Sequence, residues 1–171
     1  MAELKSENKI TMEPHYYNVD IIWNKDRKGV MCSPELNLSN GETNSCIEVA
    51  TPPEFPKGIP GIWSPEHLFT AAVSSCLMTT FLSIAENSKL GFISFSCKSL
   101  GKLEQVDGKF LMTEIILEPT ITIVDEKDRE KALRVIQKSE PACLISNSIK
   151  SKITMLPKIK VRVDMVMRAN A

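Results

Sequence analysis

The sequence lacks an excess of charge of either sign. Its 171 residues include 21 lysines and arginines against 21 aspartates and glutamates, so the formal net charge is zero. Proteins that bind nucleic acids or anionic membrane surfaces mainly through charge carry a basic excess. We therefore expect no nucleic acid and no membrane among the main partners of this chain.

The N-terminus lacks the apolar run and cleavage site of a signal peptide, since it reads Met-Ala-Glu-Leu-Lys. The least charged stretch, residues 68–85, is near the length of a membrane span but contains several serines and threonines. A buried helix at a protein–protein contact explains this stretch better. These features predict a soluble, cytoplasmic protein.

The five cysteines include no CxxC pair. The only two histidines, His15 and His67, do not stand at zinc-ligand spacing to any cysteine, so we expect no structural zinc. An odd number of cysteines in a chain without a secretion signal argues against a disulfide framework. These observations leave open whether individual thiols take part in a reaction.

The pattern of secondary-structure signals predicts a single α+β domain over residues 1–171, with residues 1–13 as a poorly ordered extension. β-Branched and aromatic residues, turn residues and apolar periodicity place the elements. Strands are expected at 14–24, from 30 to 32, 46–50, 92–106, 109–124 and 158–167, and helices from Pro65, at 125–139 and at 142–150.

The first predicted helix has the clearest signals. Ser64 is a good N-cap, Pro65 suits the first helical position, and Glu66 adds negative charge to the first turn. From residue 68 to residue 85 the helix is apolar or small on every face. We therefore expect it to be central and covered on all sides.

The two long strands that follow meet at Asp107-Gly108, the pair preferred in a two-residue hairpin turn because both positions need positive φ. Apolar residues alternate along both strands, so one face of the hairpin should be buried. Pro141 then ends the next helix and begins the last, short one.

The cysteines differ in their surroundings. Cys97 lies on the apolar face of a strand, and Cys32 and Cys46 lie in or beside short strands, so packing explains all three. Cys143 falls in the first turn of the predicted short helix, where free N–H groups and the helix dipole favour a thiolate. Cys76 stands mid-helix among small residues and, on local evidence alone, fits a core position.

Two separated motifs resemble the OsmC/Ohr family of osmotically induced and organic hydroperoxide resistance proteins. One is Trp-Ser-Pro-Glu-His-Leu-Phe-Thr-Ala-Ala-Val-Ser-Ser-Cys at 63–76, and the other is Cys-Leu-Ile-Ser-Asn-Ser-Ile at 143–149. The resemblance extends from about Val19 to the C-terminus. It implies an OsmC-like fold, formed as an intertwined homodimer with central helices flanked by antiparallel β-sheets.

The resemblance also implies roles for four residues. Cys76 corresponds to the thiol that attacks peroxide, Cys143 to the resolving thiol, and Glu66 to the carboxylate that positions a catalytic arginine. Arg27, in Lys-Asp-Arg-Lys-Gly, is the candidate for that arginine. The chain has Leu144 where the family often has proline and lacks a Gly-Gly-Arg context, which favours a general OsmC-like branch.

The implied activity is the reduction of organic hydroperoxides, and of hydrogen peroxide as a further candidate. A thiolate attacks the O–O bond, and an arginine lowers the thiol pKa and donates hydrogen bonds to the departing oxygen. The resulting sulfenic acid condenses with a second thiol, and an external dithiol, of the lipoyl type in the family, reduces the disulfide. No metal or organic cofactor is required.

One inference follows from helix geometry alone. Glu66 and Cys76 are ten positions apart on one predicted helix, which separates their backbones by roughly 15 Å. Another segment or a second subunit must therefore join them if both serve one site. We expect two sites per dimer, at the subunit interface.

Two other classes of function stay open. The chain could be a non-catalytic redox sensor or small-molecule-binding dimer that keeps the fold and oxidises once at Cys76 and Cys143. Alternatively, both cysteines could serve only as packing, which predicts unreactive thiols with ordinary pKa values.

Overall fold

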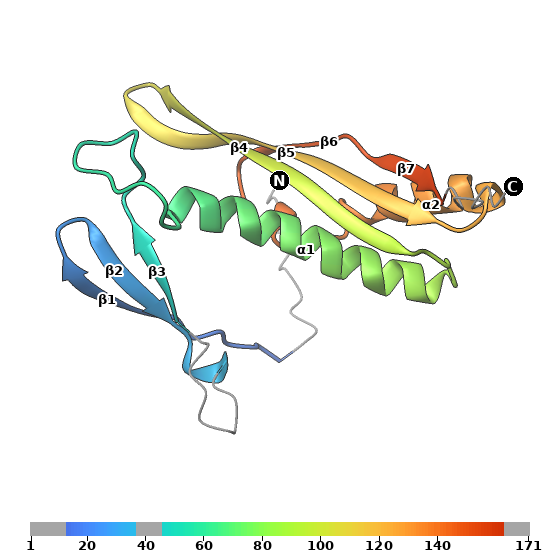
Figure 1. The fold of residues 1–171 in the computed structure, drawn as a ribbon, viewed down its shortest axis with the longest axis horizontal. Coiled ribbons are helices and arrows are strands. Elements are labelled where there is room, and N and C mark those ends of the chain that lie inside the picture. Colours follow the sequence, from blue (N-terminus) through green and yellow to red (C-terminus); the bar gives the residue numbers. More distant parts are fainter. Residues whose placement is uncertain (1–12, 37–45, 163–171) are drawn as a thin grey trace, which may run out of the picture. The chain divides into compact units, whose positions relative to one another are not determined.

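A computed structural model describes residues 13–36 and 46–162. The chain divides into two compact units, residues 1–63 and residues 64–171. The first unit is a small sheet and the second is a sheet with two helices (Figure 1). The extension predicted at residues 1–13 lies, apart from Glu13, outside the described residues, and the single-domain assignment stays a prediction.

The first unit is an antiparallel sheet in the order β1-β2-β3. Its strands are β1 (Asp20–Lys25), β2 (Lys28–Cys32) and β3 (Cys46–Ala50). A 3-10 turn, η1 (Pro34–Leu36), follows β2. The predicted first strand was too long, because the described chain has no strand before Asp20. The third strand was predicted with its observed bounds.

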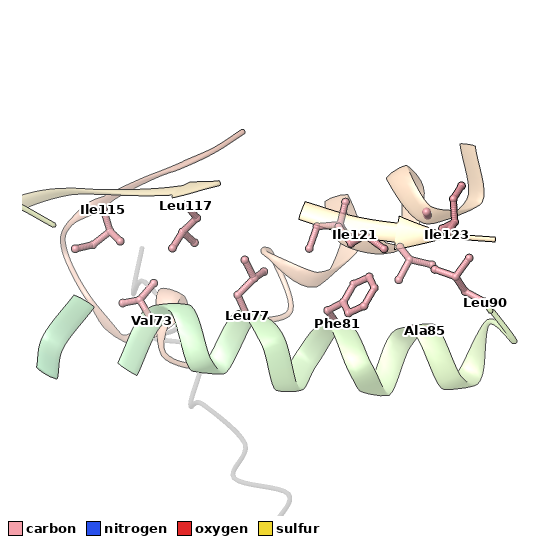
Figure 2. Close-up of a cluster of buried hydrophobic side chains, with 12 residues drawn as sticks. Val73, Leu77, Phe81, Ala85, Leu90, Ile115, Leu117, Ile121 and Ile123 are labelled. Carbon is pink, nitrogen blue, oxygen red and sulfur yellow. The ribbon is translucent and has the colours of Figure 1, made fainter. Parts of the chain in front are cut away.

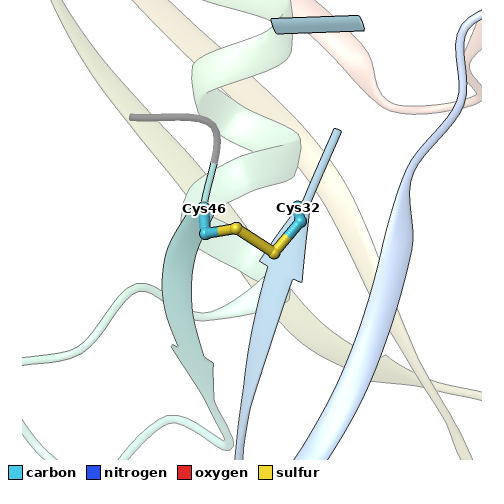
Figure 3. The surroundings of a disulfide bond; sticks show 2 residues. All are labelled: Cys32 and Cys46. Carbon is cyan, nitrogen blue, oxygen red and sulfur yellow. A yellow bond between two sulfur atoms is a disulfide. The ribbon is translucent and has the colours of Figure 1, made fainter. Parts of the chain in front are cut away.

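A disulfide joins Cys32 to Cys46 in this sheet (Figure 3). The two cysteines are directly opposite in the register of β2 and β3, with their Cα atoms 4.1 Å apart. The expectation of no disulfide is therefore wrong for this pair, because the number of cysteines does not reveal which strands lie side by side. Disulfides rarely persist in the cytosol. This bond therefore counts against the predicted cytoplasmic location, which stays a prediction.

The second unit is built around β5 (Lys109–Ile123). One edge of β5 pairs antiparallel with β4 (Ser94–Val106), and its other edge pairs in parallel with β6 (Lys152–Met155) and then β7 (Lys158–Val161). β6 was not predicted, since its four residues give too short a pattern. The last predicted strand begins correctly at Lys158, and its residues from 163 onward lie outside the described chain.

α1 (Pro65–Asn87) begins and ends with well-formed caps. The Ser64 hydroxyl accepts a hydrogen bond from the His67 N–H at 3.3 Å, as expected of an N-cap. At the other end Lys89 takes φ 52°, and the Leu90 N–H donates to the Ala85 carbonyl at 2.9 Å. This Schellman-type ending satisfies the last carbonyls of the helix.

One face of α1 packs on the sheet. Figure 2 shows Val73, Leu77, Phe81 and Ala85 pointing from the helix toward β5. Their counterparts on β5 are Ile115, Leu117, Ile121 and Ile123, all fully buried.

The opposite face of α1 is exposed, with Met78 38% and Leu82 41% accessible. The prediction that the helix is covered on all sides included burial at a protein–protein contact, so for this face it stays a prediction. By length and composition α1 could cross a membrane. Its packing against the sheet identifies it instead as a core helix with one uncovered face.

Two glycines and their neighbours shape the long hairpin. Asp107 and Gly108 have φ of 50° and 78°, so the predicted turn is confirmed. A Cβ on Gly101 would lie 2.2 Å from the Thr70 hydroxyl of α1 and 2.6 Å from the Met112 methyl group. The absence of a side chain at Gly101 thus lets α1 approach β4 closely.

α2 (Arg129–Ser139) follows a 3-10 turn, η2 (Glu126–Asp128), close to the predicted helix at 125–139. It buries Ala132, Val135 and Ile136. The helix predicted at 142–150 is wrong. The chain forms turns there, with only the short 3-10 element η3 (Ser146–Ser148).

We predict that Leu77→Ala will lower the free energy of unfolding by about 2–5 kcal/mol, because the leucine is fully buried between α1 and β5. The matched change Leu100→Ala, at a 63% exposed position of β4, should cost less than about 0.5 kcal/mol. Urea unfolding at one protein concentration measures both. Equal losses would contradict the assignment of the core.

Candidate functional site

Cys76 lies on the buried face of α1 and is 9% exposed. It stands one residue before Leu77 and three after Val73, both fully buried core residues. Cys76 is one of three cysteines in the described chain that form no disulfide. The prediction that it occupies a core-like position is confirmed, and its chemistry depends on what meets its sulfur.

The segment that meets Cys76 is the turn after α2. Within it the Cys143 N–H donates to the Glu140 carbonyl at 3.0 Å, and the Asn147 N–H donates to the Cys143 carbonyl at 3.1 Å. The Asn147 side-chain amide donates to the Pro141 carbonyl at 2.9 Å. Ile145 packs against the hydrophobic core. The turn is therefore closed by hydrogen bonds and anchored by an apolar side chain.

This turn brings Cys143, which is fully buried, against Cys76. Burial raises the pKa of the Cys76 thiol, because a thiolate loses solvation in the interior. A hydrogen bond from the Cys143 thiol and another from the Ile145 N–H lower it. The Thr80 hydroxyl and the Leu144 N–H act in the same direction. The net result is a lowered pKa, so the site favours the Cys76 thiolate.

The pKa of Cys143 moves the other way. Burial raises it, and the hydrogen bond to Cys76 raises it further. The Ser146 hydroxyl makes no conventional hydrogen bond within the described residues, but it lies close enough to the Cys143 sulfur to oppose part of this rise. Of the two thiols, Cys76 is therefore the one that loses its proton more readily.

The helix-dipole argument made for Cys143 was wrong, because no helix begins there. The free N–H groups of this segment do stabilise a thiolate, but it belongs to Cys76. Backbone donors from Leu144 and Ile145 reach across to α1, which the local sequence around Cys143 cannot reveal.

Cys97 differs from this pair. It is half-buried on β4, and burial raises the pKa of its thiol while the neighbouring Ser99 hydroxyl, 3.5 Å away, lowers it less. A hydrophobic strand position with a raised pKa fits the predicted packing role. Among the three free cysteines only Cys76 has a lowered pKa.

Glu66 lies in the first turn of α1, on the same continuous helix as Cys76. Its Oε2 atom is buried and has no hydrogen-bond partner within the described chain. A buried carboxylate oxygen without a donor is rare in native structures, because the lost solvation is not replaced. The Glu66 Oε2 atom therefore needs an N–H donor, such as the guanidinium of an arginine.

Arg27 belongs to the first unit, in the turn between β1 and β2, and is exposed. The structure thus brings two of the four predicted site residues together, Cys76 and Cys143. Glu66 lies in the first turn of the same helix, ten residues before Cys76, and Arg27 lies in the other unit. Within residues 13–36 and 46–162, no group of three or more histidine, cysteine or acidic side chains could hold a metal ion.

Sequence reasoning missed two contributors to the site. Thr80 stands one helical turn after Cys76, and its hydroxyl donates to the Cys76 sulfur. Asn147 closes the turn that carries Cys143. The spacing of four residues on the helix was a usable signal for Thr80, and the Ser-Asn pair of the second motif was one for Asn147.

Comparison with known proteins identifies the family. The OsmC-like protein family matches residues 58–157, which include both cysteine motifs. The chain belongs to this family. No curated protein matches the sequence.

Solved structures share the OsmC-like fold. An OsmC-like protein of unknown function from Vibrio cholerae matches with a TM-score of 0.70 and 20% identity, covering 84% of this chain and 99% of its own. An organic hydroperoxide resistance protein from Elizabethkingia anophelis matches with a TM-score of 0.66 and 21% identity, covering 88% and 99%. An OsmC-like protein from Mycoplasma pneumoniae matches with a TM-score of 0.66 and 17% identity, covering 86% and 99%.

We predict that Cys143→Ala in this OsmC-like protein will raise the pKa of Cys76, because the variant removes the thiol donor. Cys143→Ser keeps a donor and should raise the pKa less. Alkylation rates against pH, measured in a Cys97→Ala background so that Cys76 is the reporting thiol, give both values. An unchanged Cys76 pKa in the alanine variant would contradict the assigned contact.

Proposed function

We propose that this protein is a thiol-dependent peroxidase that reduces organic hydroperoxides, with Cys76 as the attacking thiol and Cys143 as the resolving thiol. The observation that carries the proposal is the lowered pKa of a buried cysteine whose sulfur accepts a hydrogen bond from a second cysteine. Family membership and the names of structural neighbours agree with it.

In the first step the Cys76 thiolate attacks the terminal oxygen of the hydroperoxide. A sulfur–oxygen bond forms and the O–O bond breaks, which leaves a sulfenic acid on Cys76 and an alkoxide that takes up a proton and departs as alcohol. An ordinary thiol, with a pKa of about 8.5, is only roughly 3% ionised at pH 7. The donors around Cys76 therefore raise the fraction of protein that can react.

In the second step the Cys143 sulfur, after losing its proton, attacks the sulfenic sulfur and displaces water. The product is a Cys76–Cys143 disulfide, which protects the sulfenic acid from further oxidation. An external dithiol, of the lipoyl type by resemblance to the family, then reduces this disulfide and becomes a disulfide itself. The sum is hydroperoxide plus dithiol giving alcohol, water and oxidised dithiol.

Glu66 and Arg27 take the supporting roles. The buried Glu66 oxygen lacks a donor within the described chain, and a guanidinium supplies two parallel N–H groups that match a carboxylate. Arg27 makes no side-chain hydrogen bond or ion pair to the described residues, so its donors are available. We assign it to hold the departing oxygen, with Glu66 fixing its orientation.

A homodimer completes the proposal. The exposed face of α1 carries Met78 and Leu82 beside small residues, which allow a second helix to come close. Burial of this face against the same face of a second copy gives a central pair of helices with the sheets outside. The cytoplasm is the proposed location.

The turnover assay tests the proposed reaction. Wild-type protein supplied with excess dithiol should consume many equivalents of cumene hydroperoxide, and Cys76→Ser should lose at least about a hundredfold in rate, since a serine hydroxyl does not ionise near neutral pH. The wild-type rate should rise with pH as the Cys76 thiolate forms and level off below the range of an ordinary thiol, because the pKa is lowered.

Cys97→Ser is the matched control, because Cys97 is a free cysteine outside the Cys76–Cys143 pair. It should leave the rate unchanged. Consumption of a single equivalent of peroxide per chain, without turnover, would instead identify a redox sensor. Equal and negligible consumption by the wild type and Cys76→Ser would refute both the peroxidase and the sensor.

The dimer is tested by sedimentation. We predict that the wild type sediments as a dimer and that Leu82→Glu shifts it toward the monomer, because a charge would have to be buried between helices. Leu100→Glu, on the exposed face of β4, should leave the dimer intact. A wild type that is a stable, active monomer would rule out the proposed assembly.

A further inference from the structure

The Cys32–Cys46 disulfide is a redox group that the proposed reaction does not use. It joins the end of β2 to the start of β3 (Figure 3), where the two cysteines are partners in the strand register. Cys46 is exposed and Cys32 is half-buried, whereas Cys76 is only 9% exposed and Cys143 is fully buried. The Cys32–Cys46 pair is therefore the more accessible of the two to a reagent in solution.

The sheet that contains this disulfide has little hydrophobic core of its own. Among residues 13–36 and 46–63, which are the described part of the first unit, only Gly29, Ala50 and Pro52 are buried, and none of them has a large side chain. Every residue of β1 is exposed. Small units without a sufficient core depend on cross-links for their order. The disulfide is therefore a main constraint that keeps β3 paired with β2.

The β2–β3 pair connects the disulfide to the turn that carries Arg27. The strand register has the two cysteines opposite each other at one end and Lys28 opposite Ala50 at the other. Directly after Ala50, the Thr51 N–H donates a hydrogen bond to the Arg27 carbonyl at 3.0 Å. If β3 separates from β2, the turn loses the hydrogen bond that holds the Arg27 backbone.

An external dithiol, which the proposed reaction already requires, can open this disulfide. A thiolate of the dithiol attacks the more exposed Cys46 sulfur, the Cys32–Cys46 bond breaks, and Cys32 leaves as a thiolate. The second thiol of the reagent then displaces the Cys46 sulfur. The dithiol becomes a disulfide, and its two electrons and two protons end on the two cysteines. The oxidised dithiol closes the bond again by the reverse exchange.

The exposure of this disulfide favours a bond that opens and closes over a fixed cross-link. Exposed disulfides have more oxidising potentials than structural ones, so dithiols reduce them more readily. In the cytosol, which is the proposed location, the disulfides that form are usually transient and catalytic or redox-sensing. A reversible bond between Cys32 and Cys46 is therefore compatible with that location, whereas a permanent one is not.

We propose that Cys32 and Cys46 form a second thiol–disulfide exchange site, at which a small alkyl dithiol attacks Cys46, and that opening this bond loosens the β2–β3 pair and the turn with Arg27. The disulfide-bonded protein is the form that reacts faster with hydroperoxide, and it accumulates when hydroperoxide has consumed the dithiol. This effect on reactivity rests on the role of Arg27 in the proposed function. The exchange site itself does not depend on Cys76.

Exchange is measured first, on the full chain in an equimolar buffer of dihydrolipoamide and lipoamide, by alkylation of the thiols and mass spectrometry. More than about half of the chains should carry alkylated Cys32 and Cys46, because an exposed disulfide has a more oxidising potential than a structural one. A Cys32–Cys46 disulfide that stays intact in the folded protein would overturn the inference.

Leu77→Ala distinguishes attack on the folded protein from attack after global unfolding, because it destabilises the core of the second unit. Exchange on the folded protein should proceed at the wild-type rate in Leu77→Ala and in its matched control, Leu100→Ala. A rate of disulfide reduction that rises about thirtyfold or more in Leu77→Ala alone would follow the lost stability. The bond would then open only in the unfolded chain, and the inference would fail.

Loosening of the sheet is measured by hydrogen exchange in the double-serine variant, which combines Cys32→Ser and Cys46→Ser. The amides of β2, β3 and Thr51 should exchange at least about tenfold faster than in the disulfide-bonded wild type, because the cross-link between positions 14 residues apart is gone. Wild type reduced by dithiol should match the variant, and the amides of α1 should be unchanged. Equal exchange in β2 and β3 with and without the bond would contradict the proposed loosening.

Oxidation of Cys76 separates this inference from the proposed function. It is measured without dithiol, so that the Cys32–Cys46 bond stays closed in the wild type. The second-order rate constant with cumene hydroperoxide should fall about threefold to tenfold in the double-serine variant, since fewer molecules hold Arg27 in place. In an Arg27→Gln background the same two serines should have no further effect, because the residue through which they act is gone.

The outcomes of this last measurement are distinct. An unchanged rate constant in the double-serine variant contradicts the control of reactivity and leaves the peroxidase standing. Two serines that slow Arg27→Gln as much as the wild type contradict the route through Arg27. Dithiol exchange and a loosened sheet in a protein that does not react with hydroperoxide support the exchange site and remove the peroxidase.

Discussion

The hydrogen bonds that converge on the Cys76 sulfur are the constraint on which the candidate site depends. A buried thiol ordinarily resists ionisation, yet here the Cys143 thiol and two backbone N–H groups lower its pKa. These donors come from a turn more than sixty residues later in the chain. Because β5 and β6 pair in parallel, the chain between them must cross over from one end of the sheet to the other. α2 and the turn after it form this crossover connection. The sheet topology therefore places Cys143 next to α1.

Local signals predicted most elements of the second unit. Ser64 and Pro65 marked the start of α1, and Asp107-Gly108 marked the hairpin, because caps and tight turns depend on a few neighbouring residues. The helix at 142–150 was wrong, because hydrogen bonds of Asn147 and packing of Ile145 hold this segment in turns. β6 was missed because only its pairing with β5 defines it.

For the candidate site, two sequence motifs identified the two cysteines that the structure brings together, but the local sequence misassigned which sulfur accepts hydrogen bonds from the free N–H groups. That assignment depends on which segments meet, as does the Cys32–Cys46 disulfide. Two further features of the described chain agree with the proposed dimer and the proposed role of Arg27. One face of α1 remains exposed, and the buried Glu66 oxygen has no donor among the described residues. In the proposed function a second copy covers the exposed face of α1, and Arg27 donates hydrogen bonds to the Glu66 carboxylate.

The central claim is that Cys76 and Cys143 react as a pair. Peptide mapping after addition of one equivalent of an organic hydroperoxide, in the absence of reductant, tests it most directly. We expect a new disulfide between the Cys76 and Cys143 peptides, with Cys97 still open to alkylation and the Cys32–Cys46 disulfide unchanged. Cys76 recovered as a free thiol, or oxidised to sulfinic acid while Cys143 stays reduced, would contradict it.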